Sequence, residues 1–74
     1  SMSLKDVTTG KVQVSQRTIE ILQPVYGKHG VNLRQPFQSE QHLRETLAKV
    51  SVREHMSPEQ CNIMAGVLKL VEDQ

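Results

Sequence analysis

The chain has 74 residues, which is enough for one domain with a thin hydrophobic core and too few for two. It holds one tyrosine, one phenylalanine and no tryptophan, so aliphatic side chains and three methionines must fill the interior. A formal net charge of +1 argues against a typical nucleic-acid-binding module, which carries a much larger cationic surplus.

The cysteine count and the hydropathy pattern indicate where the protein works. Cys61 is the one cysteine, so an intrachain disulfide is excluded and an intracellular protein is favoured. We expect the cytoplasm, with the nucleus as the alternative. No apolar run approaches the roughly 20 residues of a membrane-spanning helix, so no membrane partner is expected.

Residues 1–14 are predicted to be a flexible N-terminal arm, in which Ser1 and Met2 are typical of a tag remnant. The alternation from Val12 to Val14 favours a short strand, but one that is too isolated to form a sheet alone. Residues 15–74 are predicted to form a single helical domain.

A first helix is predicted near residues 15–28, with Ser15 as its N-cap. The large apolar side chains that follow fall within an arc of about 160° on a helical wheel. They are Ile19, Ile21, Leu22, Val25 and Tyr26. Pro24 removes one backbone hydrogen bond, so we expect a kink or a restart there. Gly27 and Gly30 are expected to end the helix.

The connection over residues 31–37 is expected to be an ordered loop. Leu33 and Phe37 are predicted to anchor it to the core, while Pro36 prevents a helix. Ser39 then begins a second helix with a narrow apolar seam of about 60°, which makes it mostly solvated. The seam consists of Leu43, Leu47 and Val50. Glu45 and Lys49 are four residues apart in the order that favours an ion pair.

A third helix is predicted over residues 57–72. Ser57 is its N-cap, Pro58 suits the first helical position, and Gln60 completes a capping box. The large apolar residues of this helix span about 180°, wider than the roughly 100° stripe that one neighbouring helix covers. Either the helix is the central element of the bundle, or it leaves an apolar strip for a partner.

We predict a contact surface on this third helix, formed by Met64, Leu68 and Val71. Met64 suits such a surface because its flexible thioether adapts to varied partners. The remaining large apolar residues are expected to face the chain's own core, although the two halves of the helix could be reversed. These core residues are Ile63, Val67 and Leu70.

No catalytic, cofactor-binding or metal-binding site is predicted. Cys61, His42 and His55 are residues of the right types, but they lack the close pairing of metal ligands and of nucleophile motifs. The segment Thr9-Gly10-Lys11 resembles part of a phosphate-binding loop, yet the earlier glycine and the following serine or threonine are missing. The sequence therefore indicates a protein that is not an enzyme.

The alternative function is a small nucleic-acid-binding transcriptional regulator that uses Arg44, Lys49 and Arg53. Arg44 and Lys49 lie about 140° apart on a helical wheel, so these cations do not form one stripe. Interleaved glutamates favour an ordinary solvated helix face with local ion pairs. The loop before the third helix is also longer than the turn of about 3–4 residues in a helix-turn-helix motif.

The sequence thus predicts an all-α fold, a small three-helix bundle with an N-terminal arm and an ordered loop between its first two helices. The favoured function is non-catalytic: a regulatory or adaptor module that binds another protein, or a second copy of itself as a homodimer. Its contact surface is expected on the C-terminal helix.

Overall fold

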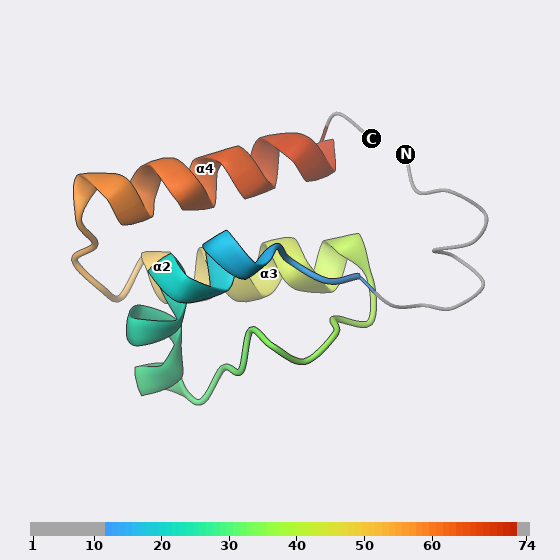
Figure 1. Cartoon of the computed structure of the whole chain (residues 1–74), viewed down its shortest axis with the longest axis horizontal. Coiled ribbons are helices and arrows are strands. Elements are labelled where there is room, and N and C mark those ends of the chain that lie inside the picture. The colour runs from blue at the N-terminus through green and yellow to red at the C-terminus, as the bar shows by residue number, and fades with distance from the viewer. Residues whose placement is uncertain (1–11, 73–74) are drawn as a thin grey trace.

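The computed structural model describes the backbone of residues 12–72 and the side chains of residues 12–69. It confirms the all-α three-helix bundle. Helix α2 (Gln16–Tyr26) continues into the 3-10 turn η1 (Gly27–His29), and α3 (Glu40–Ser51) and α4 (Pro58–Glu72) follow. In Figure 1, α4 lies along one side of the bundle, and it packs against both α2 and α3.

Each α-helix begins at the serine that the sequence predicts as its cap. Ser15 and Ser39 accept hydrogen bonds from the backbone N–H three residues later, at 3.2 and 3.0 Å. Ser57 and Gln60 form the predicted capping box, with reciprocal hydrogen bonds of 3.1 and 2.9 Å. The Gln60 Nε2 also donates to the backbone carbonyl of Ile21 at 3.3 Å, which ties the first turn of α4 to α2.

Helix α2 continues through Pro24 to Tyr26, so the predicted restart at the proline does not occur. Pro24 lacks the N–H that would bond the Glu20 carbonyl, but both residues are exposed, and water can serve that carbonyl instead. The predicted end at residue 28 falls inside η1. Gly30 follows in the left-handed region, at φ 76°, a conformation that favours glycine at this position.

The hydrophobic core comes from α2, the loop after η1, and α3. Both predicted loop anchors, Leu33 and Phe37, are buried, and so are all three residues of the α3 seam. Met56, in the link between α3 and α4, is a core residue that the periodicity of the helices does not reveal. The core residues are Ile19, Leu22, Val25, Tyr26, Leu33, Phe37, Leu43, Leu47, Val50 and Met56.

The side chain of Gln23 helps to hold the loop against α2, together with the buried loop anchors. Its Nε2 donates to the Val31 carbonyl at 2.8 Å, and its Oε1 accepts from the Leu33 N–H at 2.8 Å. Two buried or half-buried backbone groups of the loop are satisfied in this way. The loop therefore has a fixed path even though it contains no helix or strand.

Of the predicted arm, residues 1–11 lie outside the described residues. Val12 forms an isolated antiparallel bridge with Phe37, through backbone hydrogen bonds of 2.9 and 2.8 Å. Val12 and Val14 are half-buried and pack against the core. The chain entering α2 is thus paired with the loop that precedes α3.

Candidate interaction surface on helix α4

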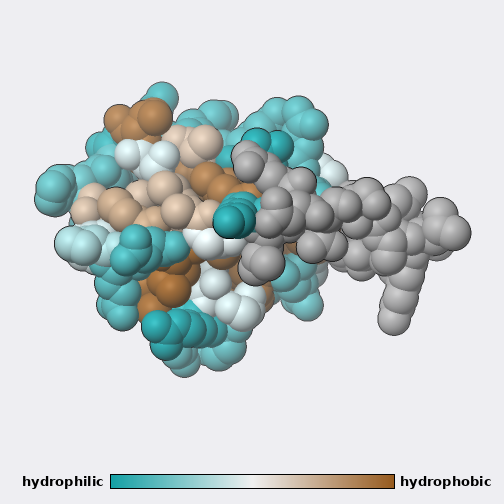
Figure 2. Space-filling model, turned by 90° about the horizontal axis from the view of Figure 1, so that it is seen from above, coloured by the Kyte–Doolittle hydropathy of each residue, from teal (hydrophilic) through white to brown (hydrophobic). Residues whose placement is uncertain are grey.

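Helix α4 is apolar but is not buried. Its four large apolar side chains between residues 58 and 69 pack against the core and are only half-buried, and none of the residues 58–69 is fully buried. These four residues are Ile63, Met64, Val67 and Leu68. Figure 2 looks down on α4 and shows brown and tan apolar atoms along the middle of this face, with hydrophilic atoms at its edges.

The predicted division of α4 into an inward and an outward half is not seen in the described side chains. Met64 and Leu68, the predicted contact residues, are half-buried, and so are Ile63 and Val67, the predicted core residues. The helix packs on α2 with one flank and on α3 with the other, so each flank gains one neighbour. The side chain of Val71, the third predicted contact residue, lies outside the described side chains, as does that of Leu70.

Leu68 lines a groove between α3 and α4 with a volume of about 340 Å³. The α3 wall of this groove is formed by Gln41, Arg44, Glu45 and Ala48. An apolar side chain from another protein could therefore reach Leu68 beside the aliphatic part of Arg44. The groove places an apolar floor between polar edges, which is the usual anatomy of a protein interface.

Small residues lie next to this surface on α4. Ala65 and Gly66 are exposed, and a methyl group added at Gly66 would meet no atom within 4 Å. No described part of the chain therefore explains a glycine in the middle of α4. A small residue at an exposed helix position lets a second backbone approach closely.

We predict that Gly66→Ala stabilises the isolated domain by about 0.5–1 kcal/mol, because alanine loses less backbone entropy in a helix and has open space here. Urea unfolding followed by circular dichroism measures this change. A loss of stability would mean that another chain already packs against Gly66 in solution.

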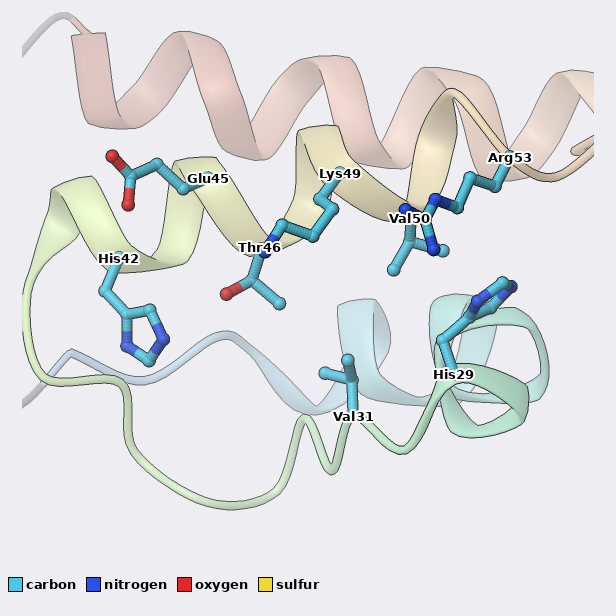
Figure 3. Close-up of a pocket in the computed structure, with 8 residues that line it drawn as sticks. All are labelled: His29, Val31, His42, Glu45, Thr46, Lys49, Val50 and Arg53. Carbon is cyan, nitrogen blue, oxygen red and sulfur yellow. The ribbon is translucent and has the colours of Figure 1, made fainter.

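The three predicted nucleic-acid-binding residues are divided between two places. Arg44 lines the groove beside Leu68, whereas Lys49 and Arg53 line a second hollow on the loop side of α3. Figure 3 shows this second hollow, with His42 at one end and with His29 and Arg53 at the other. Its volume is about 330 Å³. The cations thus do not form the single footprint that a phosphate backbone would need.

The spacing of residues in the sequence could have revealed this second hollow. The angle between Arg44 and Lys49 on a helical wheel does not reveal it, because Arg44 belongs to the other groove. His42, Thr46, Lys49 and Arg53 are separated by four, three and four residues, which places them within about 60° of one another on a helical wheel. All four line the hollow. His29, on the opposite wall, comes from η1 and could not be found from spacing.

Cys61, His42 and His55, whose side chains are of types found in catalytic and metal sites, have separate surroundings in the structure. Cys61 is exposed, and its Sγ donates a weak hydrogen bond to the Met56 carbonyl at 3.7 Å. The His42 ring packs edge-on against Phe37, and His55 is exposed. Over residues 12–72, no three His, Cys, Asp or Glu residues are placed so that they could hold a metal ion.

Comparison of this chain with protein-family models, with curated proteins and with solved structures found no match. Within the described part of the chain, no helix has both the length and the apolarity needed to span a membrane. The longest of these helices, α4, has 15 residues.

Proposed function

We propose that this domain is a non-catalytic protein-interaction module of the regulatory or adaptor kind, which associates through the apolar face of α4. One observation carries the proposal. The fully buried core residues come from α2, the loop, α3 and the link after α3, while the longest and most apolar helix has all its described large apolar side chains only half-buried. Covering such a strip contributes roughly 25 cal/mol for each Å² of apolar surface removed from water.

Met64 and Leu68 are the centre of the proposed surface. Both lie on α4, and Leu68 also borders the groove beside α3, so a partner can contact the two helices together. Ala65 lies one position from Met64 and is exposed, which leaves room for a partner helix. A second copy of the chain offers a matching apolar helix, and a two-fold pair requires only one self-complementary surface.

The nucleic-acid alternative has weaker support. It needs Arg44, Lys49 and Arg53 on one surface, and the structure places Arg44 in a different depression from the other two. The net charge of +1 also provides little attraction for a polyanion.

The test is the oligomeric state of the wild type and of Leu68→Glu, measured by sedimentation velocity over a range of concentrations. We expect the wild type to self-associate and the variant to be monomeric, because the substitution places a charge in a contact that must lose its water. Circular dichroism should show that the variant keeps its helices, since Leu68 is only half-buried.

Val52→Glu is the matched control. It makes the same kind of change at an apolar residue that is 81% exposed, just beyond the end of α3, and it should leave association unchanged. A wild type that stays monomeric at its highest soluble concentration would contradict self-association. Unfolding of Leu68→Glu would instead assign Leu68 to the core. Dissociation by Val52→Glu alone would move the contact to the link between α3 and α4.

A further inference from the structure

Two cations, Lys49 on α3 and Arg53 just beyond its C-cap, point to a second binding site on the loop side of the bundle. Lys49 and Arg53 line the same hollow, and neither side chain has a hydrogen bond or an ion pair within residues 12–72. The predicted Glu45–Lys49 pair is not formed, and Glu45 instead accepts a hydrogen bond from Gln41 at 3.0 Å. Both positive charges therefore remain available to a ligand.

The nearby carboxylates do not cancel these charges completely. Glu54 does not line the hollow and contacts His29, with 3.0 Å between the His29 Nε2 and the Glu54 Oε1. Glu45 is the one acidic residue that lines the hollow itself. The lining therefore carries two permanent cations against one carboxylate, and such a balance suits a small anion better than a nucleic-acid strand.

The wall opposite α3 is held in place by hydrogen bonds. Val31 belongs to that wall, and its carbonyl accepts from Gln23 at 2.8 Å. His29 is fixed at one end by its contact with Glu54. A wall that keeps its shape without a ligand lowers the entropy lost on binding.

The hollow combines an apolar base with polar groups. Val31 and Val50 supply the apolar part, and the side chains of Thr46 and Lys49 lie next to each other in the close-up view (Figure 3). The volume of about 330 Å³ is at the small end of the roughly 300–1,000 Å³ that ligand pockets occupy. This lining fits a ligand with one anionic group and a short apolar part.

We propose that this hollow binds a small organic oxyanion, a carboxylate or a phosphate ester, through Lys49 and Arg53. The anionic group lies between the two cations, within reach of the Thr46 hydroxyl, and the apolar part lies on Val31 and Val50. This site is separate from the α4 surface, so the two proposals stand or fall independently.

The experiment is an NMR titration of the whole chain with butyrate and, separately, with methyl phosphate. Sodium chloride at equal ionic strength is the reference. We expect saturable shifts of the Thr46 amide and of the His29 and His42 ring signals, with a Kd on the order of 1 mM. Saturation by butyrate alone would identify the ligand as a carboxylate, and saturation by methyl phosphate alone would identify it as a phosphate ester. Saturation by both would show that the site recognises the oxyanion that the two share.

The double variant Lys49→Gln, Arg53→Gln should weaken binding by about tenfold or more, because each charged hydrogen bond to the anion is lost. The double variant Arg44→Gln, Lys69→Gln is the matched control, since it removes one arginine and one lysine outside the hollow and should bind like the wild type. Shifts that equal those with chloride, or that persist in the first double variant, would overturn the proposal. So would binding of duplex DNA without any saturable response to the small anions.

Discussion

Replacing Leu47 by alanine is expected to destabilise the domain by about 2–5 kcal/mol, the usual cost of emptying a large buried aliphatic site. Leu47 is in the middle of α3 with 0% of its surface exposed. A single core in a chain of this size rarely supplies more than about 3–5 kcal/mol, so much of the variant should be unfolded. Thermal and urea unfolding, followed by circular dichroism, measure the loss.

Val52→Ala serves as the control for this experiment. It also shortens an aliphatic side chain near the end of α3, but at a residue that is 81% exposed, so it should change stability by less than about 0.5 kcal/mol. A cost for Leu47→Ala as small as that of the control would mean that the core described above is not the one that stabilises the protein.

Tyr26→Phe is expected to lower the free energy of unfolding by about 1–2 kcal/mol at neutral pH. The variant should also lack the part of the alkaline destabilisation that comes from ionisation of Tyr26. The Tyr26 hydroxyl donates to the Leu47 carbonyl at 2.8 Å, and the side chain is fully buried. Burial, with a smaller contribution from the nearby Cys61, raises the pKa of Tyr26 from 10.0 to about 12.

The sign of the pH effect follows from these two pKa values. Below pH 10 the phenol is protonated in both the folded and the unfolded chain, and its full contribution is present. Between pH 10 and about 12 the unfolded chain releases this proton while the folded chain keeps it. The free energy of unfolding should therefore fall by about 1.4 kcal/mol for each pH unit in this range.

Urea unfolding at a series of alkaline pH values tests this expectation, with Tyr26→Phe lacking that part of the decline. Tyr26 is the one tyrosine, so tyrosinate absorbance reports its ionisation directly in the folded protein. An absorbance titration near pH 10, or an equal decline in both proteins, would contradict the buried hydrogen bond.

The parts of the fold that depend on local chemistry could be predicted from the sequence. Ser15, Ser39 and Ser57 begin helices because their side chains satisfy backbone N–H groups a few residues away. The loop anchors Leu33 and Phe37 are buried because they are the large apolar residues of an otherwise polar connection. In each case the signal lies within a few residues of the feature.

The predictions that the structure contradicts, and the features that the sequence did not reveal, depend on contacts between distant segments. A kink or a restart was expected at Pro24 from the lost hydrogen bond, but no restart occurs, because packing of the apolar face of α2 against the core continues the helix to Tyr26. The two halves of α4 could not be distinguished, because the wheel shows which residues are apolar and not which neighbours cover them. The hollow needs His29 from η1, whose position relative to α3 depends on the whole fold.

The paired hydrogen bonds of Gln23 limit which amino acids can replace it. The side chain must offer a donor and an acceptor together, at the reach of two methylene groups plus an amide, to serve the Val31 carbonyl and the Leu33 N–H. Glutamate keeps the acceptor and loses the donor, methionine has the length without either group, and asparagine is one carbon too short. A half-buried polar position is thereby as restrictive as an interior one, because the first turn of the connection from α2 to α3 relies on this primary amide for two of its backbone groups.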